Sequence, residues 1–396
     1  MGASLTWVQD IENRRQELIG LRRDLHRYPE LSFQEERTGE VVAHHLRAAG
    51  LDVRGGIAKT GVVAVLCGEK PGRTIAWRAD MDALPLGEKS PEPFASIHPG
   101  VMHACGHDGH TAIAILLAET LAAHRSELAG TAVFLFQPAE EAGTGARAMF
   151  NAGALENPRV DAVLGMHLVT KLPPGHIALR AGPTLAAADY FTIEVKGRGG
   201  HGALPHQTID PIPVAAHIVL GMENLIAREI SAKESAVLTV GQIAAGTTHN
   251  IIPASANIRG TLRTLNPVLR KHLKERAPRF VTSLAQAFQA QADFKYDGEA
   301  IPAVINDDLE TALVRRAAAA VLGEEAVSAA DAAMTSDDMG VFLEQRPGCY
   351  FWAGIGPASG APSPHHSPDF TMNEDGLMPA LQTALAAMHS ALNGYR

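Results

Sequence analysis

Residues 110–141 of the chain read HTAIAILLAETLAAHRSELAGTAVFLFQPAEE. A helical segment is expected over residues 110–124, and the apolar run Thr131–Phe136 that follows is typical of a buried strand. Further short β-rich runs occupy Gly61–Cys67, Thr74–Arg78 and Asp161–His167. Buried strands that alternate with helices indicate an α/β sheet covered by helices on both faces.

After Pro183 the order of the expected elements changes to β-α-β-β-α-β, which is the ferredoxin-like pattern. The expected strands are Tyr190–Lys196, Ala236–Ile243, Ala256–Leu265 and Asp293–Tyr296, and the helices are Pro213–Arg228 and residues 267–289. A chain of 396 residues also exceeds what one hydrophobic core usually holds. We therefore expect a discontinuous α/β domain over residues 1–183 and 303–396, with an α+β domain inserted over residues 184–302.

The composition is that of a globular chain, with 46% hydrophobic and 19% charged residues. A net charge of −9 argues against a nucleic-acid-binding protein, which usually carries a basic face. The segment Met1–Gly20 has no apolar core of a signal peptide, and no apolar run is long enough to cross a membrane. Three cysteines cannot form a closed disulfide framework, so a cytoplasmic location is expected.

Histidines concentrate in the segment His98–His110, which holds four of the chain's 18 histidines together with Cys105. In an extended loop, Cys105 and His107 could approach one metal ion, and Gly106 between them would leave room for it. The alternative is a polar loop whose histidines are solvated or cap the following helix. The neighbouring cysteine and Asp108 favour the metal site.

Other potential ligands follow the expected strands. Glu140 and Glu141 come directly after Thr131–Phe136, and Asp80 and Asp82 come just after Thr74–Arg78. The carboxyl ends of sheet strands are where α/β folds place their sites. His167 ends another apolar run, and the pair His365–His366 lies in a loop rich in proline and glycine. Each signal alone also has a purely structural explanation, but together they form the donor set of a zinc- or manganese-type hydrolase. The sequence has neither a Gly-x-Ser-x-Gly motif nor a P-loop lysine motif.

Five motifs, in order along the chain, resemble the M20 metallopeptidase family, and most closely its amidohydrolase branch of hippurate hydrolases, N-acyl-amino-acid deacylases and auxin-conjugate hydrolases. The motifs are RADMDALP (78–85), MHACGHD (102–108), QPAEE (137–141), GGHGA (199–203) and HSP (366–368). The resemblance implies a catalytic α/β domain interrupted by a smaller dimerisation or lid domain, which agrees with the inserted module.

The resemblance also implies a role for individual residues. Cys105 would bridge two metal ions, and the remaining ligands would be His107, Glu141, His167 and His366. Glu140 would be the general base, Asp82 an orienting carboxylate, and His201 a stabiliser of the oxyanion, often supplied by a partner subunit. Asn250 and Arg263 match substrate-binding positions.

The wider family has an aspartate at the bridging position and a His-x-Asp strand-end motif. Cys105 and Asp80 stand there instead, which favours amide deacylation over peptidase activity. His365 leaves the choice between the two neighbouring histidines open.

The expected function is a metal-dependent amidohydrolase that cleaves N-acyl amino acids, such as N-benzoyl or N-acetyl ones. Two divalent ions per subunit are expected (Mn, Zn, Co or Ni), as is a homodimer or homotetramer formed through the inserted domain. A dipeptidase or aminopeptidase-like hydrolase is the alternative enzyme, and a non-catalytic, metal-stabilised binding protein is the alternative outside enzymes. The acyl group and the preferred amino-acid side chain stay open.

Overall fold

The computed structural model describes residues 11–357 and 359–394. The chain divides into two compact units: unit 1 comprises Met1–Gly182, Ile305–Asp331 and Asp338–Arg396, and unit 2 comprises Pro183–Val304 and Ala332–Asp337. The sequence did not predict that Ala332–Asp337 belongs to unit 2. This short segment joins it because the N–H of Ala186 donates to the carbonyl oxygens of Ala333 and Thr335, at 3.1 and 2.9 Å.

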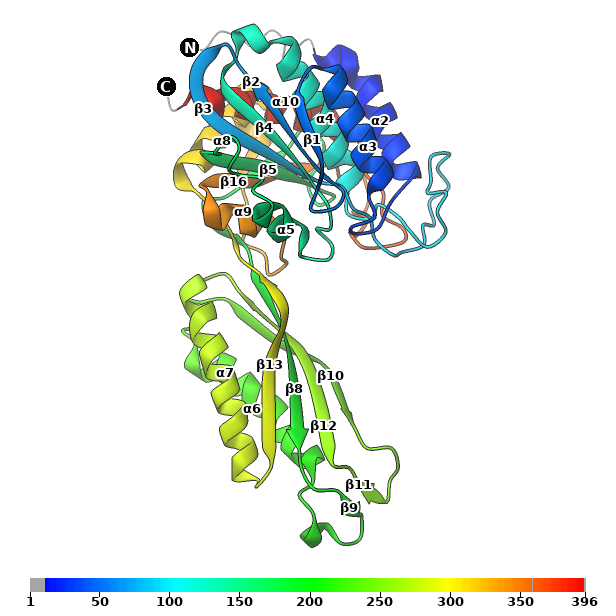
Figure 1. The fold of residues 1–396 in the computed structure, drawn as a ribbon, viewed down its shortest axis with the longest axis vertical. Coiled ribbons are helices and arrows are strands. Elements are labelled where there is room, and N and C mark those ends of the chain that lie inside the picture. Colours follow the sequence, from blue (N-terminus) through cyan, green and yellow to red (C-terminus); the bar gives the residue numbers. More distant parts are fainter. Residues whose placement is uncertain (1–10, 358, 395–396) are drawn as a thin grey trace. The chain divides into compact units, whose positions relative to one another are not determined.

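Unit 1 is built on an eight-stranded sheet (Figure 1). In spatial order the strands are β1 (Asp52–Ile57), β2 (Gly61–Cys67), β4 (Ala129–Gln137), β3 (Lys70–Asp80), β5 (Ala162–Val169), β16 (Gly348–Gly354), β6 (Ile177–Leu179) and β15 (Val327–Ala329). Strand β3 runs parallel to both β4 and β5, and β16 runs parallel to β5. The four neighbouring strands β4, β3, β5 and β16 therefore end at the same edge of the sheet.

Helices cover both faces of this sheet. One face packs against α2 (Arg15–Arg27), α3 (Glu36–Ala48), α4 (His107–Ala123), α8 (Asp308–Leu322) and α10 (Leu377–Asn393), whose apolar residues form one cluster with those of the strands. The other face contacts α5 (Gly145–Asn151) and α9 (Met339–Gln345). Helix α4 is buried on nearly all sides, as its apolar sequence requires.

One helix start differs from the sequence prediction. The sequence also predicts an amphipathic helix over Trp7–Arg27; residues 7–10 lie outside the described residues, and a 3₁₀ turn at Ile11–Arg14 leads into α2. Helix α4 begins at His107 rather than His110, so His107 is the first residue of a helix and not part of an extended loop. Within the described residues, no helix combines the length and apolar character needed to cross a bilayer.

Unit 2 has the β-α-β-β-α-β order expected from the sequence. Its main elements are β8 (Ala187–Lys196), α6 (Pro211–Glu229), β10 (Ala236–Ala245), β12 (Ser255–Thr264), α7 (Pro267–Ala287) and β13 (Gln291–Ile301). They form an antiparallel sheet in the order β10-β12-β8-β13, which is the ferredoxin-like arrangement (Figure 1). Apolar residues of α6 and α7 pack against one face of this sheet. The expected α/β fold class with an inserted ferredoxin-like domain is confirmed.

The shorter strands complete the chain. They are β7 (Gly182–Leu185), β9 (Gly200–His201), β11 (Ile251–Ile252) and β14 (Val304–Asn306). Strands β9 and β11 pair with each other in unit 2, so the loops after β8 and after β10 are joined there.

Candidate metal centre

The candidate ligands of unit 1 gather where the four parallel strands end. Asp80 is the last residue of β3, Glu140 and Glu141 follow β4, and His167 lies near the end of β5. The loop after β16 carries His366, and Cys105 comes two residues before the first residue of α4. Adjacent parallel strands bring these chain segments together, although they are far apart in the sequence.

Two groups of potential metal ligands share Cys105. One group is Cys105, His107 and His167, and the other is Cys105, Glu141 and His366; within each group the ligand atoms lie within 4.8 Å of one another. The Sγ atom of Cys105 is 3.4 Å from Nε2 of His167. On the other side, Nε2 of His366 is 3.3 Å from Oε1 of Glu141. All five ligands implied by the resemblance therefore occur in these two groups.

Two buried atoms at this place suit a metal ion. Among the described residues, neither Nε2 of His107 nor Oε1 of Glu141 has a hydrogen-bond partner, and the two atoms are 3.9 Å apart. Burying an imidazole nitrogen and a carboxylate oxygen without partners is unfavourable. A divalent cation would supply the missing interaction for both, and thiolate, imidazole and carboxylate are ligands that such ions accept. The residues present therefore fit a divalent metal ion.

In His107 and His167 the Nδ1 atom makes a hydrogen bond, and the Nε2 atom is left to bind a metal ion. His107 donates from Nδ1 to the backbone carbonyl oxygen of Asp82 at 2.9 Å, so Nε2 faces the other ligands. His167 donates from Nδ1 to the carbonyl oxygen of Leu168 at 2.8 Å, and its Nε2 faces Cys105. Burial and the neighbouring His110 lower the pKa of His167, which favours the neutral form that binds metals.

The two neighbouring histidines of the last loop have different surroundings. His365 donates from Nε2 to the carbonyl oxygen of Leu168 at 3.1 Å, and burial lowers its pKa to about 4. His366 has the left-handed backbone angle φ = 57°, and its N–H donates to the carbonyl oxygen of Ala104 at 2.8 Å. This turn directs the His366 side chain towards Glu141. The structure thus groups His366, and not His365, with the other candidate ligands.

The Asp82 side chain mainly contacts the backbone of Glu140 and Glu141, the acidic pair. Its Oδ1 accepts the backbone N–H of Glu140 and its Oδ2 that of Glu141, both at 3.0 Å. The hydroxyl of Ser32 donates to Oδ2 at 2.7 Å. Burial would raise the pKa of Asp82, but His107 and Ser32 outweigh it and hold the pKa below its usual value. The ionised Asp82 side chain therefore fixes the backbone of both glutamates, whereas its backbone oxygen orients His107.

Asp80 is held by contacts that the sequence analysis did not identify. It accepts from Nη1 of Arg78 at 2.7 Å and from Nδ1 of His110 at 2.6 Å. The other ring nitrogen of His110 accepts the N–H of Leu168 at 2.9 Å. Arg78 and His110 thus fix the strand ends that carry Asp80 and His167. Arg78 opens the first motif and His110 lies two residues after the second, which was the available signal, but motif spacing does not reveal which side chain bonds to which.

The remaining residues of the histidine-rich segment have structural surroundings. His98 is exposed, and its ring centroid is 6.4 Å from that of Tyr28. His103 is 1% exposed, and neither ring nitrogen has a hydrogen-bond partner in the described chain. Gly106 is required for its conformation, since φ is +90° there, whereas a Cβ atom would meet only ordinary contacts at 3.6 Å or more. Gly106 thus meets a backbone requirement, and its expected role in leaving room for an ion stays a prediction.

The three candidates in unit 2 lie at two places. His201 pairs with Ile251, and the N–H of Gly202 donates to the carbonyl oxygen of Asn250 at 2.9 Å, so His201 and Asn250 are neighbours. Arg263 lies near the opposite end of β12 and donates to the carbonyl oxygen of Met334 at 3.3 Å. Ser255 is the first residue of β12 and lies at the end closest to β11. Arg263 is eight positions further along this strand, a distance of roughly 26 Å.

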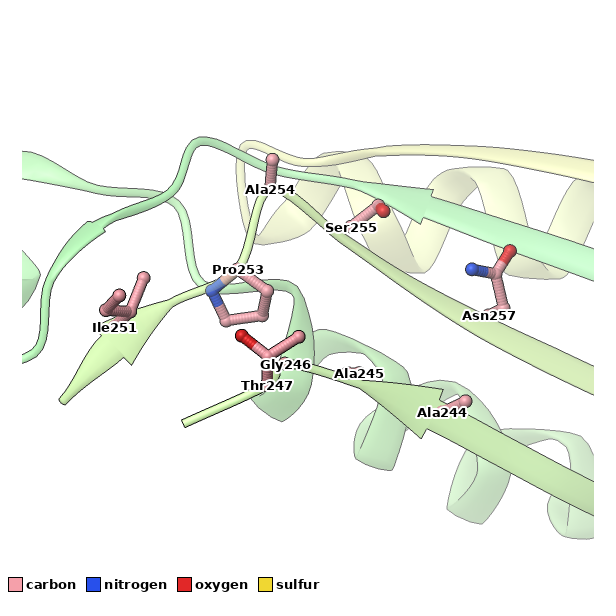
Figure 2. Close-up of a pocket in the computed structure, with 9 residues that line it drawn as sticks. All are labelled: Ala244, Ala245, Gly246, Thr247, Ile251, Pro253, Ala254, Ser255 and Asn257. Carbon is pink, nitrogen blue, oxygen red and sulfur yellow. The ribbon is translucent and has the colours of Figure 1, made fainter. Parts of the chain in front are cut away.

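A pocket of about 340 Å³ lies between the end of β10 and the start of β12, beside Ile251 (Figure 2). Small side chains such as Ala244, Ala254 and Ser255 line it. None of the proposed metal ligands is among its lining residues. All of its lining residues belong to unit 2.

Residues 76–390 match the model of peptidase family M20/M25/M40. The chain is 41% identical over 366 residues to the N-acetylcysteine deacetylase of Bacillus subtilis (strain 168), covering 92% of this chain and 94% of that protein. It is 43% identical over 299 residues to the N-acyl-L-amino acid amidohydrolase of Geobacillus stearothermophilus, covering 75% and 80%. A crystal structure of a Bacillus subtilis dinuclear metal binding peptidase from the M20 family superposes with a TM-score of 0.83 at 37% identity, covering 95% and 98%. The resemblance inferred from the motifs is thus confirmed, and the chain belongs to peptidase family M20/M25/M40.

Proposed function

We propose that this protein is a metal-dependent amidohydrolase that hydrolyses the amide bond of N-acyl amino acids to a carboxylate and a free amino acid. The observation that carries the proposal is the acidic pair Glu140–Glu141, held by Asp82 next to two ligand groups that share Cys105. The similarity to a deacetylase and an amidohydrolase of N-acyl amino acids supports the substrate class.

The two ligand groups support a centre for two divalent ions in each subunit, with manganese, zinc, cobalt and nickel as candidates. Cys105, His107 and His167 would hold one ion, and Cys105, Glu141 and His366 the other. When bound, such ions lower the pKa of a water molecule and polarise the scissile carbonyl group. The protein's own residues bring the substrate and a proton acceptor to this place.

Glu140 is proposed as the general base. Its backbone is fixed by Asp82, and its Oε2 lies 3.9 Å from Nε2 of His107, beside the ligands. Its carboxylate also forms a group with His107 and Glu141, in which the ligand atoms lie within 4.8 Å of one another, so Glu140 is close enough to reach a water molecule at the metal centre. In this role Glu140 accepts a proton from water and delivers it to the leaving amine nitrogen, a contribution of roughly 10²- to 10⁴-fold.

His201 is proposed to stabilise the oxyanion, and Asn250 and Arg263 to bind the substrate. Within unit 2, Arg263 lies roughly 26 Å along the strands from the end near His201 and Asn250, a separation longer than an N-acyl amino acid. One small substrate cannot contact both places of the same unit 2. If both places serve one substrate, a second subunit must supply one of them.

A homodimer formed through the inserted domain is therefore part of the proposal. Strand β10 is at the edge of the sheet, where its outer backbone groups can pair with another chain. Apolar side chains are exposed on this strand and on the neighbouring helix α6: Ile243 is 53% exposed, Ile212 45% and Leu220 69%. These surfaces support association of two copies there.

Mixing two inactive variants tests the contribution of the second subunit. His201→Ala and Glu140→Gln should each be inactive, whereas mixed dimers should recover up to about one working site in two. One of their sites then combines an intact Glu140 with an intact His201. If the subunits exchange and no activity returns, His201 does not act on the partner's site.

A panel of substrates tests the reaction itself. N-acetyl and N-benzoyl amino acids, assayed with Mn²⁺, Zn²⁺, Co²⁺ and Ni²⁺, should be hydrolysed with metal dependence. An exopeptidase is the second candidate, because the M20 structure with a TM-score of 0.83 is described as a peptidase. Faster cleavage of a dipeptide with a free amine than of its N-acetylated form would favour the exopeptidase.

A cytoplasmic location is also part of the proposal. The three cysteines, which form no disulfide with one another, support it.

A further inference from the structure

Ala139, the residue before the acidic pair, has a backbone conformation that alanine rarely adopts. Its φ is 54°, in the left-handed region, and the residue is fully buried. The N–H groups of the next two residues, Glu140 and Glu141, donate to Asp82. The conformation at Ala139 sets the direction in which the chain enters this pair. Whatever stabilises it therefore also orients both glutamates.

The N–H of Ala139 donates to a second buried carboxylate, that of Glu35, at 2.8 Å. The same oxygen, Oε1 of Glu35, accepts the N–H of Phe33 at 3.0 Å. The other oxygen accepts the hydroxyl of Thr60 at 2.5 Å. Three consecutive N–H groups, from residue 139 to residue 141, are thus held by two carboxylates from different parts of the chain.

The Glu35 side chain does not cap helix α3, although the residue stands at the N-cap position. From this position, directly before α3, a carboxylate could accept N–H groups of the first helical turn. Within the described residues Glu35 accepts none of them. Glu30 does so instead, accepting the N–H of Arg37 at 3.0 Å and that of Thr38 at 2.8 Å. Because Glu30 caps the helix, the Glu35 carboxylate is available for Ala139.

The loop around Ala139 leaves little room for other arrangements. A Cβ atom on Gly145 would lie 1.6 Å from the carbonyl oxygen of Pro138, so the two backbones are in direct contact. Ala139 is 0% exposed, and water therefore has no access with which to replace a lost acceptor. Without Glu35, the chain would have to change its conformation at Ala139 to satisfy this N–H group.

We propose that Glu35 is a positioning residue that holds Ala139 in the left-handed conformation and thereby aims Glu140 and Glu141 at the metal centre. The catalytic part of this inference rests on the proposed function. The part that concerns the loop and metal binding does not.

Three substitutions separate the length of the Glu35 side chain from its charge. Glu35→Gln keeps an oxygen within reach of Ala139 but removes the charge. Glu35→Asp keeps the charge but is shorter by one methylene group, and Glu35→Met removes both acceptors at similar volume. Glu30→Met is the matched control, because the Glu30 side chain also holds two backbone N–H groups but, among the described residues, makes no hydrogen bond to the loop at Ala139.

Three measurements follow these variants: amide hydrogen exchange of the peptide that contains residues 139–141, Mn²⁺ affinity of the metal-free protein, and kcat and KM on an N-acetyl amino acid. Glu35→Met should accelerate exchange at residues 139–141 and lower Mn²⁺ affinity and kcat by about 10- to 100-fold, with little change in KM. Glu35→Asp should change them in the same direction but less, and Glu35→Gln should stay close to wild type. Glu30→Met should reduce stability only.

Several results would overturn the inference. These are wild-type exchange and Mn²⁺ affinity in Glu35→Met, an equal loss in Glu30→Met, or a larger loss in Glu35→Gln than in Glu35→Asp. If Glu35→Met does not fold, the comparison of Glu35→Asp with Glu35→Gln decides. A wild-type protein without amidohydrolase activity would refute the proposed function alone, because exchange and Mn²⁺ affinity still report on Glu35.

Discussion

Replacing Asp82 by asparagine should separate the acidic pair from its support while leaving the size of the side chain unchanged. The carboxylate accepts from the backbone of Glu140, the backbone of Glu141 and the hydroxyl of Ser32. Asparagine offers one oxygen and one NH₂ group. Whichever way its amide is turned, the NH₂ group faces a backbone N–H, so one of the two glutamates loses its acceptor.

The size of the effect follows from these contacts. A hydrogen bond to a charged group contributes about 1.5–3 kcal/mol, and the bond that remains is weakened because the acceptor becomes neutral. A loss of about 2–3 kcal/mol corresponds to a roughly 30- to 150-fold smaller population of the correctly arranged loop. We expect kcat to fall by about this factor. Because the pKa of Asp82 is held below its usual value, it stays ionised near neutrality, and the loss should not vary with pH there.

The assay is steady-state hydrolysis of an N-acetyl amino acid, with the metal content of each sample measured in parallel. Ser32→Ala is the matched control, because it removes one donor but leaves the carboxylate and both backbone bonds in place. It should lower kcat by less than about fivefold. The reasoning is refuted if Asp82→Asn keeps kcat within fivefold of wild type at full metal content. The reasoning is also refuted if saturating metal restores the kcat of Asp82→Asn completely.

Further predictions concern the proposed base Glu140, the proposed shared ligand Cys105 and the buried His103. Glu140→Gln should keep its metal, measured by elemental analysis, but lose nearly all turnover, because only the proton acceptor is removed; a parallel fall in metal content would make Glu140 a ligand. Cys105 should react with a thiol-alkylating reagent far faster in chelated than in metal-loaded protein, as followed by peptide mass spectrometry, and equal rates would contradict its role as a shared ligand. Burial lowers the pKa of His103 to about 4, below the value of about 6.5 in an unfolded chain, so the unfolded state takes up a proton first as the pH falls. The metal-free protein should therefore lose about 2 kcal/mol of stability from this group between about pH 7 and about pH 5. Urea unfolding of wild type and His103→Phe should show this difference in pH dependence, and identical pH dependence in both would contradict it.

The elements of both units follow from patterns that are local in the sequence. The apolar run Thr131–Phe136 lies within β4, which extends from Ala129 to Gln137, and the alternation after Pro183 corresponds to the ferredoxin-like unit. Such patterns are readable because each apolar residue reports directly on which face of an element is buried. The start of α4 was missed because the helix begins inside the histidine-rich segment, directly after Gly106 in a left-handed conformation. Helix patterns in the sequence carry little information about such a start.

The sequence by itself determined the family, the order of elements and the identity of the candidate ligands, because motifs and hydrophobic periodicity depend on neighbours in the chain. Only the tertiary structure decided which side chains meet. It grouped His366 rather than His365 with Glu141, and it directed the Asp82 carboxylate to the backbone of the acidic pair. It also joined Glu35 to Ala139, 104 positions further along the chain. Hydrogen bonds between such distant segments depend on the packing of whole strands and helices, and no local spacing in the sequence records them.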